Sequence, residues 1–326
     1  MKLIHLLWAG LTFVRSAITH LVHDGPVKLA TKVVRAAIAD EALLTSVVGH
    51  WRVVRLMSRN HTRVLIRHHP QLLYRYVSEN LAKSFPKRWR REILINHYQY
   101  LIEHVREDFF EVLLASSPEI WRGSDKHSLF AIKLSFTGIQ NFDGDLLLTF
   151  TQADKHLYQL AFTIVPGWVL GCSLANVMLI SRIQGARGEF EAIRHATKSC
   201  RDIALPHQLM ASAHGIAEAL DIAMIAGLRI GEFPYGADAE LNIKFDYEAF
   251  WRSFVSEAKG GFYLVSVPLI EKPLAQIDRV HRRRALSKRK FKAAITETAC
   301  RRFRKDFRKP SAYSEANSDS TNMVKI

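Results

Sequence analysis

A block of strand-like segments between residues 128 and 184 is the feature that most constrains how this chain can fold. Apolar, β-branched and aromatic residues dominate each segment, and turn residues separate the segments. The turn over residues 152–155 is short enough to join two antiparallel strands as a hairpin. We expect strands over residues 129–136, 145–151, 156–165 and 175–184.

The connection after the fourth of these strands has a different character. Two helix-like segments follow it, the second with Pro206 at a position that suits a first helical turn, and another buried strand-like run comes next. Strand, helix and strand in this order predict a parallel pair joined by a right-handed crossover. The expected elements are helices over 189–200, 206–220 and 247–255, and strands over 221–228 and 262–267.

The segments before and after this group of strands and helices are helical in character, up to residue 125 and again from residue 276. Apolar residues such as Leu72, Leu73 and Tyr76 recur at helical spacing before it, and the last residues are rich in Ser and Asn. We therefore expect an α+β fold, with a mixed, mainly antiparallel sheet and flanking helices. The expected parts are a helical region over 1–125, a mixed α/β core over 126–275, a basic helical arm over 276–310 and a disordered tail over 311–326.

The arm carries most of the charge of the chain. Between Arg279 and Lys309 fourteen Lys and Arg face two acids, which is +12 of a formal net charge of +15 and leaves +3 elsewhere. Such an arm attracts an anionic membrane surface, lipopolysaccharide or nucleic acid, although a solvated helix face is the alternative. Because the arm offers few aromatic side chains, we expect any nucleic-acid binding to be charge-driven and unspecific.

The N-terminus and the cysteines bear on location. An apolar run follows Lys2, but Arg15 ends it, no cleavage site follows, and the run is too short to cross a bilayer. A helix docked on the core and an interfacial amphipathic helix both remain open. The three cysteines fit neither a redox pair nor a zinc site, which favours a reducing compartment without structural disulfides.

The turn after the fourth strand is the strongest candidate for a ligand site. Strand, glycine turn and helix together aim backbone N–H groups at an anion, and glycine lets a phosphate approach closely. The same arrangement is also an ordinary strand-to-helix connection. The candidate binding residues are Gln184, Gly185, Ala186, Arg187 and Gly188 in the turn, with Arg194 and Lys198 one helical turn apart on the helix that follows.

Candidates for proton transfer are His97 and Tyr247. His97 lies among aromatic residues on a predicted helix, where a buried structural histidine is the alternative. Tyr247 follows Asp246, which is well placed to cap the helix over 247–255. We predict no metal site, because the adjacent His68 and His69 face different directions on a helix.

The chain resembles the VirK/YbjX family of Gram-negative bacteria over about residues 65–295. That resemblance implies a role in virulence and envelope biology, namely surface-protein display and resistance to antimicrobial peptides, and supplies no catalytic residue. The chain departs from the family pattern at 200–206 and 227–230. The segments that carry the resemblance are 97–101, 136–138, 157–163, 183–187, 193–198, 246–251 and 281–284.

Two functions follow as hypotheses. The first is a factor at the cytoplasmic face of the envelope, in a cytoplasmic protein that the arm and the N-terminus attach peripherally to the inner membrane. The second is a loosely GNAT-like acyltransferase using an acyl-coenzyme A or similar donor. In GNAT enzymes a strand leads into a glycine turn that grips the pyrophosphate of coenzyme A. Here Arg182 and Gly185 fit that turn, whereas Gly188 comes one residue late.

Overall fold

The structure is a computed structural model that describes residues 47–126, 128–137, 144–234 and 245–309. The predicted amphipathic N-terminus and the predicted disordered tail lie outside these residues. Within them the fold is α+β, with N-terminal helices followed by a mostly antiparallel sheet and flanking helices, which confirms the predicted class.

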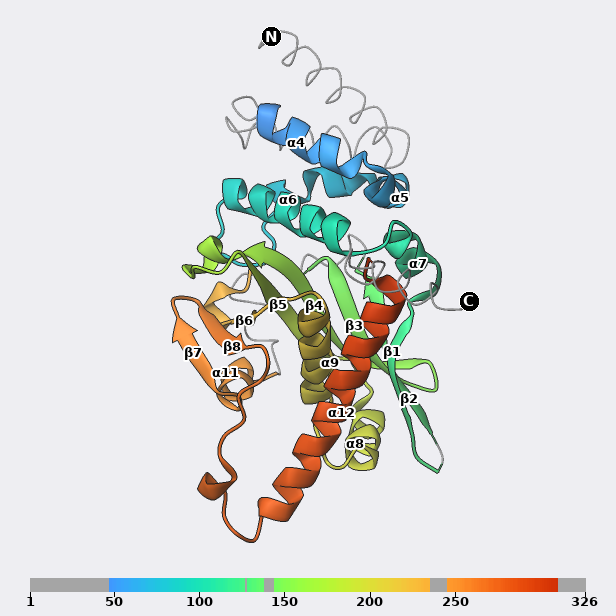
Figure 1. Cartoon of the computed structure of the whole chain (residues 1–326), viewed down its shortest axis with the longest axis vertical. Coiled ribbons are helices and arrows are strands. Elements are labelled where there is room, and N and C mark those ends of the chain that lie inside the picture. Colours follow the sequence, from blue (N-terminus) through green and yellow to red (C-terminus); the bar gives the residue numbers. More distant parts are fainter. Residues whose placement is uncertain (1–46, 127, 138–143, 235–244, 310–326) are drawn as a thin grey trace, which may run out of the picture.

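The N-terminal helices form a layer over one end of the sheet (Figure 1). They bury Val53, Leu65, Leu72 and Tyr98 in the core shared with the strands. The layer consists of α4 (Val47–Met57), α5 (Asn60–His68), the 3-10 helix η1 (Pro70–Val77), α6 (Lys87–His104) and α7 (Phe109–Ser116).

Eight strands form one sheet in the order β1-β2-β3-β4-β5-β6-β8-β7. Neighbours pair antiparallel except β5 and β6, which are parallel with Ile180 opposite Gly227, as the sequence predicts. Ala153 and Asp154 both have positive φ in the predicted hairpin between β3 and β4. The strands are β1 (Glu119–Ser124), β2 (Leu129–Phe136), β3 (Leu146–Gln152), β4 (Lys155–Pro166), β5 (Asn176–Gly185), β6 (Met224–Leu228), β7 (Ser256–Lys259) and β8 (Phe262–Ser266).

Two edge strands differ from the sequence-based expectation. β1 lies inside the stretch over 1–125 for which only helices were predicted, so that prediction was wrong from residue 119 onward. β7 was not predicted at all. Both strands are short and partly exposed, with only Ile120 and Trp121 of β1 buried, so neither shows the apolar alternation that marks a strand.

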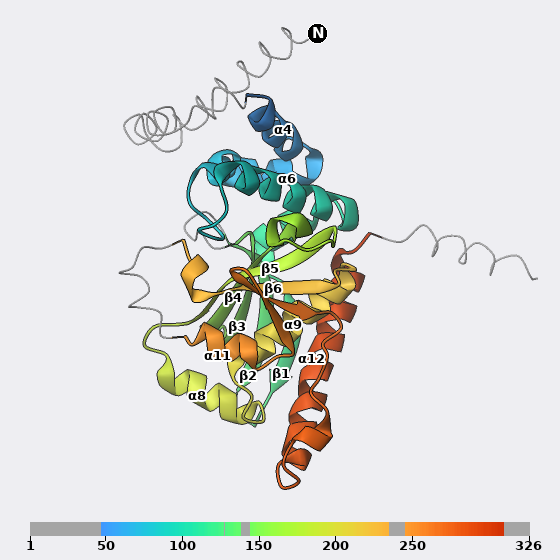
Figure 2. The same cartoon turned by 90° about the vertical axis from the view of Figure 1, so that its left-hand side faces the viewer.

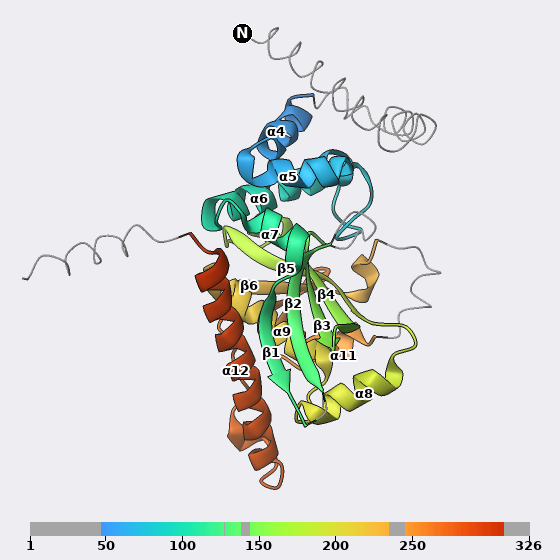
Figure 3. The same cartoon turned by 90° about the vertical axis from the view of Figure 1, so that its right-hand side faces the viewer.

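Helices α9 (Leu205–Ala219) and α12 (Arg282–Phe307) cross each other closely beside the sheet, with α12 running along β1 (Figure 3). A Cβ on Gly215 of α9 would lie 2.3 Å from the Thr296 carbonyl oxygen, so glycine allows this approach. Ile295, Phe303 and Phe307 of α12 are buried, and the second half of the basic segment is therefore part of the core. The first half extends past the sheet, away from the helical layer (Figures 1 and 2).

The remaining elements connect these parts. They are α8 (Phe190–Ser199), α11 (Tyr247–Arg252) and the short 3-10 helices η2 (Gly167–Leu170), η3 (Ile230–Glu232) and η4 (Leu274–Gln276).

Candidate functional site

The first half of the predicted glycine turn belongs to the sheet. Gln184 and Gly185 pair with β4, and the Ala186 N–H donates to the Leu157 carbonyl oxygen at 2.9 Å. A Cβ on Gly185 would lie 2.9 Å from the ring of Tyr158. Gly185 therefore serves close packing, and the Ala186 N–H is already engaged by the sheet.

The second half of the turn is open. Gly188 has a φ of +80°, which favours glycine, and a Cβ there would meet nothing within 4 Å. The N–H groups of Arg187, Gly188 and Phe190 donate to no group in the described part of the chain. All three residues are exposed, so these donors lie on an open surface at the start of α8.

Charges of both signs surround this surface. Arg187, Arg194 and Lys198 are exposed and form no ion pair with any residue that the structure describes. Glu189, however, forms an ion pair with Lys155 at 2.6 Å, and Glu191 lies in the first turn of α8. The arrangement suits a weakly held anion better than a tightly bound one, because the two carboxylates offset the positive end of the helix and repel an incoming anion.

Tyr247 lies directly beside this turn. Its hydroxyl donates to the Ile183 carbonyl oxygen at 2.8 Å and accepts from the Ile183 N–H at 2.9 Å. Pairing between β5 and β6 ends at Ile180, and the tyrosine therefore replaces the missing strand partner. Asp246 caps α11 by accepting from the Ala249 N–H at 2.9 Å, which confirms the structural role expected for it.

Trp251 fills the neighbouring space. Its ring would lie 1.9 Å from a Cβ on Gly227, so the glycine of β6 makes room for the indole. Tyr247 and Trp251 are both buried. The side chains of α11 thus occupy the place between the two parallel strands where their pairing stops.

His97 is a buried residue at the other end of the sheet. Its Nδ1 accepts from the Ile164 N–H at 3.0 Å, on the part of β4 that projects beyond β3. Burial lowers the pKa of His97 to about 4, although Asp145 opposes this shift, so the ring is neutral at pH 7. Ile164 lies six residues along β4 from Tyr158, the partner of Gly185, which is roughly 20 Å. The structure therefore does not bring His97 to the turn.

The buried ion pair between Arg75 and Asp145, next to His97, was not predicted from the sequence. Asp145 accepts hydrogen bonds from Arg75 at 2.8 Å, Tyr98 at 3.0 Å and Thr163 at 2.9 Å. Burial raises the pKa of Asp145, but Arg75 and the other partners outweigh this and hold it below its usual range. The network ties η1 and α6 to the sheet. The one sequence signal for this network was an acidic residue, Asp145, at the start of an apolar strand.

Residues 46–298 match the family described as a protein of unknown function (DUF535). The chain belongs to the DUF535 family. VirK/YbjX proteins belong to this family too, which agrees with the resemblance in the sequence. No curated protein and no solved structure matches the chain.

Besides the turn at 184–188, the chain has a second candidate site, a cationic segment over residues 279–292 that we call the basic tip. It contains eight Lys and Arg and no acid, and it comprises the turn before α12 and the projecting start of that helix. Arg284 pairs with Asp202 at 2.9 Å, while Arg289 and Lys292 share Glu271. Arg279, Arg283 and Lys290 are exposed and pair with no acid of the described residues.

A pocket of about 500 Å³ opens at the basic tip. Four cations line it together with one acid and the exposed Val280. This concentration of positive charge was predicted from the sequence, but its location on one projecting helix end was not. The lining residues are Arg201, Asp202, Val280, Arg283, Arg284, Ser287 and Lys288.

Three further observations bound the chemistry. Across the described ranges, no group of three or more His, Cys, Asp or Glu side chains is placed to hold a metal ion. Cys172, Cys200 and Cys300 are free thiols, and burial raises the pKa of Cys200 to about 11. No helix between residues 47 and 309, outside the gaps given above, is long and apolar enough to cross a bilayer.

Proposed function

We propose that this DUF535 protein is a peripheral factor that binds anionic membrane surfaces at the cytoplasmic face of the envelope. The observation that carries the proposal is the basic tip, eight cations without an acid at the projecting end of α12. The envelope role implied by the VirK/YbjX resemblance agrees with it. The tip is one end of the part of the chain that the structure describes, so it can reach a flat surface without the described body intervening (Figure 2).

The tip combines charge with exposed apolar side chains. Val280 is 82% exposed and Leu286 is 40% exposed, in the midst of the arginines. Juxtamembrane cations contribute about 1 kcal/mol each near an anionic surface, so Arg279, Arg283 and Lys290, for whose side chains the described structure gives neither an ion pair nor a hydrogen bond, supply about 3 kcal/mol. Such a free energy of binding is marginal alone, and partial insertion of Val280 and Leu286 into the membrane would add an apolar contribution to it.

The test is vesicle flotation of the full chain. We expect binding to phosphatidylcholine vesicles that contain phosphatidylglycerol, weak binding to pure phosphatidylcholine, and loss of binding at high salt because exposed charges are screened. Equal binding to both vesicle types, or none to either, would contradict the proposal. Deleting the whole basic arm over 276–310 is not a usable test, since Phe303 and Phe307 within it belong to the core.

An acyltransferase is the second candidate, favoured by the strand order. An antiparallel group leads through β5, a glycine turn and helices to the parallel strand β6, which loosely fits the order around the donor site in GNAT enzymes. Two helices, α8 and α9, lie between β5 and β6 in place of one, and this fits less well. The free N–H groups of Arg187 and Gly188 stand where a pyrophosphate would lie. The Tyr247 hydroxyl opposes this reading, because it occupies the Ile183 edge along which an acyl donor would lie.

Calorimetry with coenzyme A and acetyl-coenzyme A tests this second candidate. Arg187→Glu should abolish the heat of binding, whereas Arg122→Glu, which changes an exposed arginine of β1, should leave it unchanged. Tyr247→Phe should strengthen binding by freeing the edge of β5. Absence of heat at high micromolar ligand would exclude coenzyme A as the cofactor.

A further inference from the structure

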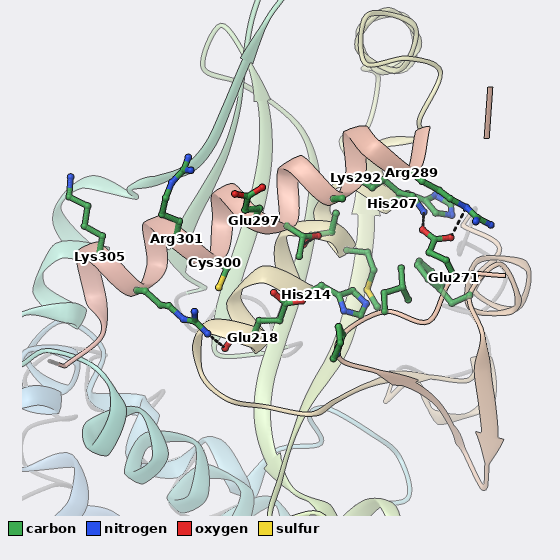
Figure 4. A pocket seen from close by; sticks show the side chains of 18 residues that line it. His207, His214, Glu218, Glu271, Arg289, Lys292, Glu297, Cys300, Arg301 and Lys305 are labelled. Carbon is green, nitrogen blue, oxygen red and sulfur yellow. Dashed lines mark hydrogen bonds and ion pairs between the residues drawn. The ribbon is translucent and has the colours of Figure 1, made fainter. Parts of the chain in front are cut away.

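A cavity of about 940 Å³ lies between α9, α12 and the segment that follows β8 (Figure 4). Its size is at the upper end of the range of ligand pockets, which are lined by apolar side chains with a few placed polar groups. Met210, Ala211, Phe254 and Leu269 provide such an apolar lining. Neither function considered above uses this cavity.

His214 is the polar group at the floor of the cavity. It is only 2% exposed, and neither ring nitrogen has a hydrogen-bond partner in the described part of the chain. Burial, together with the nearby positive charge of Lys292, lowers its pKa to about 4, so the ring is neutral at pH 7. A buried imidazole whose N–H donates no hydrogen bond is energetically costly, and a ligand oxygen would accept that hydrogen bond.

The charges around the cavity favour an anion at one end. Arg289 and Lys292 contact Glu271 at 3.1 and 3.3 Å, at the end where His207 also lies (Figure 4). Two cations share one carboxylate there, which leaves an excess of positive charge at this end of the cavity. Glu218 also lines the cavity and lies on the other side of His214, away from Glu271 (Figure 4). Arg301, Glu297 and Lys305 line the rim on the far side of α12 from His214, so they do not contribute to this end (Figure 4).

We propose that this cavity binds a single-chain amphiphile, an acyl chain along the apolar lining with an anionic head held by Lys292 and the N–H of His214. The head takes the place beside Lys292 that Glu271 now shares. Fatty acids and lysophospholipids have this chemistry in common. The proposal stands apart from membrane binding by the basic tip, since it concerns a single bound amphiphile held by Lys292 and His214, whereas the membrane proposal depends on Arg279, Arg283 and Lys290.

The experiment measures displacement of a fluorescent dansyl-undecanoic acid from the full chain in solution. We expect palmitate to displace the probe, and a lysophosphatidylglycerol arm tells whether the larger head also fits. Uncharged monoacylglycerol and cationic dodecyltrimethylammonium should displace it at least tenfold less effectively. Failure of the probe to bind, or equal displacement by the uncharged and cationic amphiphiles, would overturn the proposal.

Matched variants locate the site. Leu269→Trp fills the cavity and should abolish probe binding, whereas Ile270→Trp, at a neighbouring exposed residue outside the lining, should not. Lys292→Met should weaken binding about tenfold, against no change for Lys259→Met at an exposed residue of β7 outside the lining. Glu271→Gln should strengthen it severalfold by freeing both cations.

His214→Leu should also weaken binding about tenfold, and its fold is checked by circular dichroism. If that variant fails to fold, Glu271→Gln and the two tryptophan variants still decide. Unchanged binding by Leu269→Trp would place the probe elsewhere and refute the proposed site.

Discussion

Replacing Asp145 with Asn is expected to destabilise the protein strongly. Asp145 is 3% exposed, and its carboxylate accepts hydrogen bonds from Arg75, Tyr98 and Thr163. Asn keeps the shape of the side chain but removes the charge. Arg75, itself 7% exposed, would then be a buried cation without a counter-ion.

The size of the effect follows from that uncompensated charge. Removing one partner of a buried ion pair costs about 3–5 kcal/mol, which is a large part of the 5–15 kcal/mol by which a typical domain is stable. With an m-value of about 3 kcal/mol per M, a loss of about 4 kcal/mol lowers the urea midpoint by roughly 1.3 M.

The assay is equilibrium urea unfolding followed by circular dichroism. The matched control is Asp154→Asn, which removes an acid from an exposed pair with Lys133 and should leave the midpoint nearly unchanged. Because the pKa of Asp145 is held low, its stabilisation is present above the pKa of the unfolded carboxyl and is lost as the pH falls through the folded value. An Asp145→Asn midpoint equal to that of the control would refute the reasoning.

Three other changes test the packing around the candidate sites. Tyr247→Phe leaves the buried N–H and carbonyl of Ile183 without partners and should cost about 2 kcal/mol in urea unfolding; no change would contradict the role of the hydroxyl. Gly215→Ala should destabilise by about 1–3 kcal/mol, because its Cβ would meet the Thr296 carbonyl, whereas Gly231→Ala, with open space around it, should not. Burial depresses the pKa of His97 to about 4, so stability should fall as the pH drops from 6.5 to about 4, and His97→Gln should flatten that slope in urea midpoints taken at several pH values.

Much of the sheet was predictable from local pattern. The strand over 129–136 was predicted with the bounds of β2, and the hairpin and the parallel pair followed from turn residues and from the helices between β5 and β6. β1 and β7 were missed because edge strands face solvent and need not alternate. Local pattern reports which side chains are buried, and these strands bury few.

The candidate sites were less predictable, since they depend on contacts between distant residues. The turn at 184–188 was found, but nothing local indicated that Tyr247 would fill the neighbouring edge of β5. His97 was recognised as a residue of interest, whereas its place at the projecting end of β4 required the tertiary structure. The cavity beside His214 depends on how α9 and α12 cross, which no short segment specifies.

The most direct test of the proposed function is the affinity of the basic tip for anionic vesicles. Arg279→Glu, Arg283→Glu and Lys290→Glu combined reverse the three exposed cations of the tip for whose side chains the described structure gives neither an ion pair nor a hydrogen bond. The matched control reverses Arg59, Arg63 and Arg67, which are exposed on or beside α5, and so makes the same change in net charge on the helical layer. We predict that the tip variant loses flotation with vesicles containing phosphatidylglycerol while the control variant retains it. Equal loss in both variants, or retention by the tip variant, would contradict membrane binding through the start of α12.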